Sequence, residues 1–387
     1  MLNFNYSIQT KIFFGKGKID VLAENIKNYG SNVLLVYGGG SIKKSGLYDK
    51  ITDIFNKNKI NFWELSGVEP NPRISSVRKG IELCHENKVD IILAVGGGSV
   101  IDCSKVIGAG YYYKGDAWDI VLDSSKINNV LPIATILTLA ATGSEMDAGA
   151  VITNLATSEK LSTSNAGMAP KFSILDPTNT FSVPKNQTAA GTADIMSHIF
   201  EVYFSNTNEA YMQNRMAEAL LKTCINYGEK AMADPTNYEA RSNLMWTSSL
   251  AINGLLSYGK VTEWSVHAME HELSAFYDIT HGVGLAILTP HWMEYALNAN
   301  TINKFVEYGV NVWGLNPDGD KYEIAHNAIK RTREYFLKLG IPSSLSEIGI
   351  GEEKLEEMAK QSTVRGSLGN FKPLAAQDVL NIFKSSL

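Results

Sequence analysis

The chain has 387 residues, of which 44% are hydrophobic and 19% are charged, and its formal net charge is −5. A chain of this length can bury more than one core, so we expect two domains. The acidic balance and the scattering of lysines and arginines argue against a surface for nucleic acid.

The cysteines and the N-terminal sequence indicate the compartment in which the protein is expected. The three cysteines Cys84, Cys103 and Cys224 are odd in number, far apart and without CxxC spacing, so neither a disulfide framework nor a sulfur-ligated zinc site follows. The N-terminus lacks a basic start followed by a long apolar stretch, and no run of 18 apolar residues occurs. We therefore expect a cytoplasmic protein that is neither exported nor inserted into a membrane.

The first half of the chain alternates short β-branched runs with helix-like stretches, which is typical of an α/β domain. Several runs are almost continuously apolar, and this predicts strands buried in a parallel sheet. The expected strands are Val33–Tyr37, Asn61–Leu65, Ile91–Val95, Leu131–Thr135 and Phe172–Leu175. A strand-like segment within Asn3–Phe14 comes before them and has an edge to pair, so we expect a homodimer or a larger homo-oligomer.

After Pro184 apolar residues recur at three- and four-residue spacing, which predicts an all-α domain. Pro177 and Pro184 interrupt regular structure and mark the hinge, so the expected domains are residues 1–183 and 184–387. The expected helices are Gln187–Phe204, Tyr211–Ala233, Glu239–Leu256, Glu263–Phe276, Gly284–Ala296, Tyr322–Leu339, Glu352–Gln361 and Ala376–Lys384.

Two GGGS loops follow expected strands. One consists of Gly38, Gly39, Gly40 and Ser41, and the other is Gly96–Ser99. Neither is the GxGxxG fingerprint, and one such loop alone is more often a plain turn between a strand and a helix. Two loops in consecutive βα units favour phosphate binding, because glycines let backbone N–H groups approach a phosphate and a helix N-terminus adds positive potential.

The first loop also bears on the choice of cofactor. Rossmann-type sites place an acidic residue near the end of a strand to hold the ribose 2′-hydroxyl, whereas this segment offers glycines, a serine and then Lys43 and Lys44. The missing acid leaves room for a 2′-phosphate and predicts NADP(H) in preference to NAD(H), with NAD(H) still possible. The two lysines can equally be solvated helix residues.

Histidines and one aspartate form a pattern typical of a metal site. Asp194 and His198 are four residues apart in a helical stretch, His267 and His271 repeat that spacing, and His281 follows ten residues later. A single histidine is more often a surface or core residue than a ligand, but three of the seven histidines fall within fifteen residues. Imidazoles with a carboxylate suit Fe(II) or Zn(II). The HExxH spacing of zinc proteases is missing.

These motifs resemble the iron-containing (group III) alcohol dehydrogenase family across essentially the whole chain. Two stretches, Ile174–Glu201 and His267–Pro290, look like the two family signatures, and the GGGS loops accompany them. Within the family the chain is most similar to the clostridial butanol dehydrogenases and related aldehyde reductases. The resemblance implies an α/β N-terminal dinucleotide-binding domain with a parallel sheet, an all-α C-terminal metal-binding domain, and an active site in the cleft between them.

The resemblance also implies roles for particular residues. It implies one divalent metal ion held by Asp194, His198, His267 and His281. His271 lies one turn from His267 and is not assigned as a ligand, and two roles are open for it: a proton relay in catalysis, alongside water and the ribose hydroxyls, or support of the ligands. Near the cofactor the resemblance places Gly97, Gly98, Ser99, Asp102, Thr138, Thr142 and Lys160. Members of the family that carry an aspartate after the first strand differ from this chain, which has glycines there.

The implied reaction is the reduction of short aliphatic aldehydes such as butanal to primary alcohols. The metal would polarise the carbonyl, and the nicotinamide would supply hydride. Two alternatives stay open from the sequence. One is a dehydrogenase of the same fold that acts on a polyol or on lactaldehyde, and the other is a noncatalytic assembly subunit.

Overall fold

The computed structural model describes residues 1–207 and 209–387. The chain divides into two compact units, each discontinuous in sequence. The helical unit contains residues 1–6, 184–234 and 250–387, and the α/β unit contains residues 7–183 and 235–249. Compared with a single division after residue 183, the first six residues group with the helical unit and residues 235–249 group with the α/β unit.

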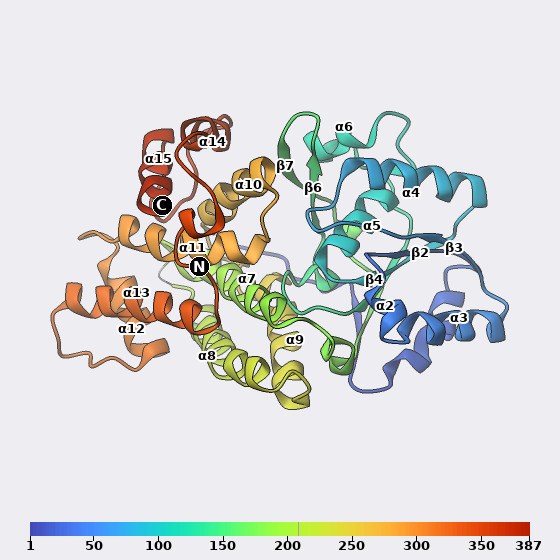
Figure 1. Cartoon of the computed structure of the whole chain (residues 1–387), viewed down its shortest axis with the longest axis horizontal. Coiled ribbons are helices and arrows are strands. Elements are labelled where there is room, and N and C mark those ends of the chain that lie inside the picture. Colours follow the sequence, from blue (N-terminus) through green and yellow to red (C-terminus); the bar gives the residue numbers. More distant parts are fainter. Residues whose placement is uncertain (208) are drawn as a thin grey trace. The chain divides into compact units, whose positions relative to one another are not determined.

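The α/β unit is built on a six-stranded parallel sheet (Figure 1), which confirms the predicted fold class. Its strand order is β1-β8-β5-β4-β2-β3. The strands are β1 (Lys11–Phe14), β2 (Asn32–Tyr37), β3 (Asn61–Leu65), β4 (Ile91–Gly96), β5 (Ile133–Leu137) and β8 (Phe172–Leu175). The strand β5 begins two residues later than predicted, because Pro132 has no N–H to donate to a neighbouring strand.

Both faces of this sheet are covered. Leu34 and Val36 of β2 belong to one core and Val33 and Leu35 to the other, so the near-continuous apolar run is buried on both sides. The helices α1 (Leu22–Lys27), α2 (Ser41–Lys44) and α3 (Leu47–Asn58) contribute to one core. The helices α4 (Ile74–Asn87), α5 (Gly98–Gly110) and α6 (Ala117–Leu122) contribute to the other.

An antiparallel ribbon of two strands, β6 (Gly149–Asn154) and β7 (Glu159–Ser164), was not among the sequence predictions. Buried Ala150 and Ile152 pack in the core that contains α5. The sequence of β7, EKLSTS, has a single large apolar residue, so the alternation that signals a strand is weak there.

The helical unit contains no strand among its described residues, as predicted. Its helices are α7 (Lys185–Tyr203), α8 (Tyr211–Ala233), α10 (Ser265–Tyr277), α11 (His281–Ala296), α12 (Ile302–Trp313), α13 (Lys321–Lys338), α14 (Leu355–Ser362) and α15 (Ala376–Ser385). The prediction missed α12. The helix α9 (Tyr238–Ile252) ends four residues before its predicted end, where Gly254 adopts a φ of 94°. Short 3₁₀ helices cover Lys18–Val21, Ser124–Lys126, Ser144–Met146, Ala166–Met168, Pro177–Thr180 and Ser346–Ile348.

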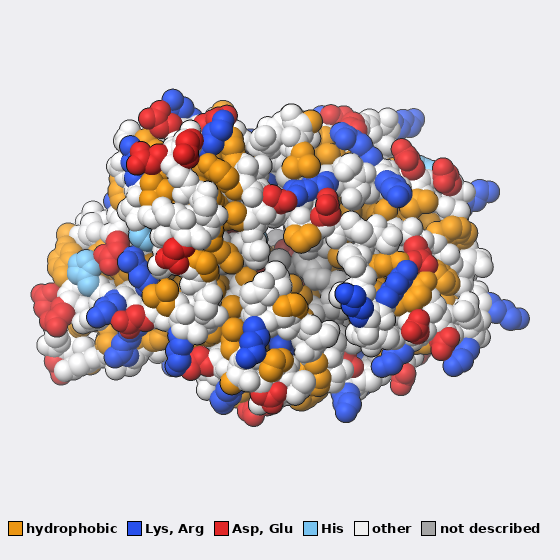
Figure 2. Space-filling model, in the orientation of Figure 1, with side chains coloured by type: hydrophobic (Ala, Val, Ile, Leu, Met, Phe, Trp, Pro, Cys, Tyr) orange, Lys and Arg blue, Asp and Glu red, His pale blue; other side chains and the backbone are white. Residues whose placement is uncertain are grey.

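Several general features of the chain bear on its surroundings. None of the helices in the described part of the chain is long and apolar enough to cross a membrane. The three cysteines are buried free thiols. On the face drawn in Figure 2, lysines and arginines are interspersed with acidic side chains rather than gathered in one patch.

Candidate functional site

Three helices of the helical unit carry the predicted metal ligands. Asp194 and His198 lie one turn apart on α7, His267 lies on α10, and His281 is the first residue of α11. These helices pack against one another in pairs. A Cβ added to Gly282 would lie only 2.0 Å from the backbone oxygen of Ala190 on α7, so the start of α11 and α7 approach each other at backbone distance.

Asp194, His267 and His281 converge on one point. The Nε2 atoms of His267 and His281 each lie 3.9 Å from Oδ1 of Asp194. One ligand atom from each of the three residues lies within 4.8 Å of the others. The structure therefore brings together three of the four predicted ligands as a compact set of two imidazoles and a carboxylate.

His198 lies beside this set but is not a member of it. Its Nδ1 atom is 3.3 Å from Oδ1 of Asp194, and its ring centroid is 4.5 Å from that of His267. Burial, followed by the neighbouring imidazoles of His267 and His281, holds the pKa of His198 well below its usual value. This ring is therefore neutral near pH 7, which is the form that binds metals.

The donor set fits a divalent cation. Among the described residues, Nε2 of His267 and Nδ1 of His198 are buried and make no hydrogen bond. A buried imidazole nitrogen without a hydrogen bond is costly unless another partner takes its lone pair. Ligand atoms about 2.1 Å from an ion at the centre of a tetrahedron lie roughly 3.4 Å apart, which is about 0.5 Å less than the distance from Oδ1 of Asp194 to each of the two Nε2 atoms.

His271 lies at the edge of the cluster. Its side chain is partly exposed, and its ring centroid is 5.8 Å from that of His281. Glu270, His271 and His281 form a second set whose ligand atoms lie within 4.8 Å of one another. The geometry is compatible with the proton-relay role and with a supporting role for His271.

Three residues of the site were missed in the sequence. Glu201 contacts His267, Glu270 contacts His281, and Trp264 lies against the rings of His198 and His267. The two acids carry a usable signal, because each lies three residues after a predicted site histidine on the same helix. No pattern in the sequence indicated Trp264 as a site residue.

Trp264 has a strained backbone. It occupies the N-cap of α10 with a φ of 64°, in the left-handed region that a bulky residue rarely adopts. Its ring centroid is 5.2 Å from that of His267 and 6.1 Å from that of His198. Strain of this kind costs about 1–3 kcal/mol and tends to persist at functional positions. Trp264 places an aromatic surface beside the cluster.

The predicted cofactor loops lie at adjacent strand ends in the α/β unit. The strands β2 and β4 are parallel neighbours, with Tyr37 opposite Val95, so the loops Gly38–Ser41 and Gly96–Ser99 leave the sheet side by side. The chain continues to β3 on one side of this pair and to β5 on the other. Such a switch point is where open α/β sheets bind dinucleotides, and α5 begins there at Gly98.

Thr138 and Thr142, which were also predicted near the cofactor, follow the end of β5. The backbone N–H of Thr138 donates to the carbonyl of Gly96 at 3.0 Å. A Cβ at Gly98 would lie 2.3 Å from Oγ1 of Thr142, so only glycine fits at this point. The structure thus places Thr138 and Thr142 against the second glycine loop.

Asp102 and Lys160 are engaged with other protein groups. Asp102 accepts hydrogen bonds from Oγ of Ser144 at 2.5 Å and from the backbone N–H of Val151 at 2.9 Å, and burial raises the pKa of its carboxyl to about 6. It therefore links α5 to the loop after β5 and to β6. The Nζ atom of Lys160 donates to Oδ1 of Asn71 at 2.9 Å and is buried.

A cluster beside the first glycine loop was also missed. Glu64, near the end of β3, accepts hydrogen bonds from the hydroxyl groups of Tyr37 and Tyr48. Although burial opposes the shift, these bonds hold the pKa of Glu64 below its usual value. The Nζ atom of Lys43 lies 3.7 Å from Oε2 of Glu64 and 4.6 Å from the centroid of the Tyr48 ring. A carboxylate therefore faces the positive charge of Lys43.

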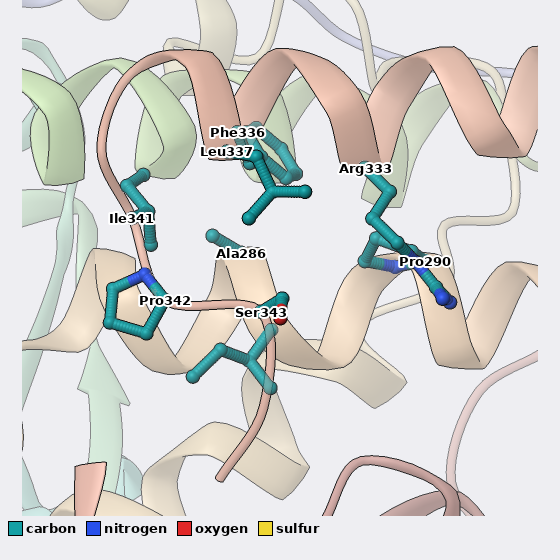
Figure 3. A pocket seen from close by; sticks show the side chains of 9 residues that line it. Ala286, Pro290, Arg333, Phe336, Leu337, Ile341, Pro342 and Ser343 are labelled. Carbon is teal, nitrogen blue, oxygen red and sulfur yellow. The ribbon is translucent and has the colours of Figure 1, made fainter. Parts of the chain in front are cut away.

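A small pocket between α11 and α13 is unrelated to either site (Figure 3). It is lined mainly by apolar side chains, with Arg333 at one side, and its volume is about 10 Å³. This is room for about one water molecule, which excludes a substrate the size of butanal.

Comparisons with known proteins cover both units of the chain. Residues 9–177 match the family model described as iron-containing alcohol dehydrogenase, and residues 188–387 match that of its C-terminal domain. The NADH-dependent butanol dehydrogenase A of Clostridium acetobutylicum is 67% identical over all of both chains. The NADPH-dependent aldehyde reductase YqhD of Escherichia coli is 38% identical over 95% of this chain and 94% of its own.

A solved structure agrees with this relation. The crystal structure of NADH-dependent butanol dehydrogenase A from Thermotoga maritima superposes with a TM-score of 0.96 at 40% identity. It covers 100% of this chain and 99% of its own. The similarity therefore extends over both units.

Proposed function

We propose, from the premise that this chain belongs to the iron-containing alcohol dehydrogenase family, that it reduces short aliphatic aldehydes such as butanal with a nicotinamide cofactor. The convergence of Asp194, His267 and His281 is the observation that carries the proposal. These residues, with His198 beside them, would hold Fe(II) or Zn(II). When bound, the ion supplies Lewis acidity that polarises the substrate carbonyl.

The side chains around the cluster have separate tasks in this proposal. Trp264 offers an apolar surface for the alkyl chain of the substrate. His271 is partly exposed next to His281 and can carry a proton to the alcohol oxygen as it forms. The loops at the ends of β2 and β4 hold the dinucleotide. Buried free thiols suit the reducing cytoplasm in which we place the enzyme.

An assay of cofactor oxidation tests the function. Purified protein is supplied with NADH or NADPH and with butanal, lactaldehyde or, in the reverse direction, glycerol, and its metal content is measured by X-ray fluorescence. A higher kcat/KM for butanal supports the proposal. A preference for glycerol or lactaldehyde would move the enzyme to another branch of the family, and no turnover of any substrate by metal-loaded protein would favour the assembly subunit.

For the cofactor, the first glycine loop and the relative at 67% identity indicate different choices. The lack of an acid at Gly39 predicts NADPH, whereas the relative at 67% identity is named NADH-dependent. The charge of Lys43 is not an argument for NADPH, because the carboxylate of Glu64 faces it and offsets its attraction for a 2′-phosphate. We propose NADH as the working cofactor, with NADPH accepted because Gly39 leaves space for a 2′-phosphate.

Substitution of Gly39 by aspartate tests how this loop discriminates. A Cβ at Gly39 meets nothing within 4 Å, so the new side chain fits. Its carboxylate would accept a bond from the 2′-hydroxyl of NADH and repel the 2′-phosphate of NADPH. We expect the ratio of kcat/KM for NADPH to that for NADH to fall at least about tenfold, which corresponds to about 1.4 kcal/mol. Steady-state kinetics with both cofactors measure it, and an unchanged ratio would show that the 2′-position does not lie at this loop.

We also propose that the protein is a homodimer or a larger homo-oligomer. The strand β1 is at one edge of the six-stranded sheet, and the residues before it include exposed Leu2, Phe4 and Ile8. An unpaired edge preceded by apolar side chains favours association. Light scattering should give a multiple of the 42.4 kDa chain mass for the full-length protein and a lower multiple after deletion of residues 1–14. A monomeric full-length protein would refute the proposal.

A further inference from the structure

Two buried carboxylates outside the predicted ligand set contact the histidines of the cluster. Oε1 of Glu201 lies 3.0 Å from the backbone nitrogen of His267 and 3.1 Å from its Nδ1. Oε2 of Glu270 is hydrogen-bonded to Nδ1 of His281, and Oε1 accepts from the hydroxyl of Ser274. The relative exposures of Glu201 and Glu270 are 2% and 0%.

These contacts select one tautomer of each ring. A carboxylate oxygen accepts a hydrogen bond from an imidazole N–H, so each contact favours the tautomer whose proton is on the Nδ1 that faces the carboxylate. The lone pair of a neutral imidazole is then on Nε2. In both rings Nε2 is the atom that lies 3.9 Å from Oδ1 of Asp194. Each carboxylate thus turns the metal-binding nitrogen of its histidine toward the same point.

The carboxylate of Glu270 is fixed in place. A Cβ at Gly284 would lie 2.8 Å from Cγ of Glu270 and 3.2 Å from its Oε1, so α11 packs directly against this side chain. Ser274, one turn further along α10, holds the oxygen that His281 does not use. A side chain enclosed on these sides cannot change rotamer without displacing a helix.

We propose that Glu201 and Glu270 are positioning residues that fix the tautomers and ring orientations of His267 and His281 and thereby set the affinity of the site for its divalent ion. The inference rests on the proposed function in that it assumes a metal at the cluster. Carboxylates behind ligating histidines typically contribute 10- to 100-fold to metal affinity. Neither residue needs to touch the metal or the substrate for this effect.

The test measures metal binding without turnover. The full-length protein is stripped of metal and titrated with Co(II) in competition with a chelator, and the visible Co(II) spectrum reports the ligand geometry. We expect Glu270→Ala and Glu201→Ala each to weaken Co(II) binding 10- to 100-fold and to alter that spectrum. Glu270→Gln keeps an oxygen that can accept from Nδ1, so it should recover a large part of the affinity.

Glu218→Ala is the matched control. Glu218 lies on α8 and is almost as buried as Glu201, but it accepts from Tyr203, Arg215 and Asn311 rather than from a histidine of the cluster. Its loss should lower the melting temperature and leave Co(II) affinity within a factor of about three. If Glu270→Ala and Glu201→Ala keep wild-type affinity for Co(II), the inference is wrong but the proposed function stands. The same holds if the control loses as much Co(II) affinity as these two variants. A wild-type protein that binds no Co(II) would overturn the proposed function as well.

Discussion

Replacing Asp194 or His267 by alanine should remove the bound metal and the activity together. Each substitution deletes one of three atoms that converge within 4.8 Å and leaves an incomplete set of donors. We expect metal content to fall from one ion per chain to less than about a tenth, and kcat to fall by about three orders of magnitude or more, because the ion is expected to contribute several kcal/mol to the transition state. Metal analysis and kinetics on the same preparation measure both.

A histidine one turn away provides the control for this experiment. His271 lies on the same helix as His267 and is only partly buried. His271→Ala should keep its metal while turnover slows or the pH profile shifts. Loss of the metal in this variant would make His271 a ligand and place the ion at the set formed with Glu270 and His281. An Asp194→Ala protein with full metal and normal turnover would remove the basis of the assignment.

Whether the sequence alone predicts that two residues of this site meet depends on how far apart they lie in the chain. The spacing of Asp194 and His198 predicts a shared helix face, because one helical turn is a local property. That His281 would meet Asp194 depends on the packing of α11 against α7, which no local pattern specifies. Here the resemblance to a family supplied what the spacing could not. Trp264 was not predicted, because its left-handed backbone is imposed by its surroundings and a bulky residue rarely adopts this conformation.

In the fold, too, local sequence patterns predicted some elements, and others depend on contacts between distant segments. The strands β2, β3 and β4 were predicted almost to the residue. For β2 and β4 the signal is a run that is apolar on both faces, as in a buried parallel strand, whereas β3 is an edge strand in which only Leu65 is buried. The ribbon of β6 and β7 was missed because β7 is polar, and its strand conformation comes from pairing with β6. The helix α12 is a different case. Its buried residues Ile302, Phe305, Tyr308 and Val312 follow helical spacing, so the signal was present in the sequence.

Replacing Gly282 by alanine should disrupt the site without touching a ligand. The added Cβ would lie 2.0 Å from the backbone oxygen of Ala190, 2.6 Å from its carbonyl carbon and 3.0 Å from its Cα. These are backbone atoms of α7, which cannot rotate away as a side chain can. Overpacking in a core costs typically 1–3 kcal/mol and sometimes more, and we expect a loss of at least about 3 kcal/mol here.

The same clash should also open the metal site. Cβ atoms essentially never approach another atom to less than 3.0 Å, so the contact with Ala190 must lengthen by at least 1 Å. Ala190 lies one turn before Asp194 on α7, and Gly282 directly follows His281, so this shift separates Asp194 from His281. Functional sites tolerate displacements of only about 0.5 Å.

Gly319→Ala is the control, since its Cβ would meet nothing closer than 3.6 Å. Thermal unfolding and Co(II) titration should show a lower melting temperature and weakened binding in Gly282→Ala alone, and wild-type values in both variants would show that α7 and α11 can part without cost.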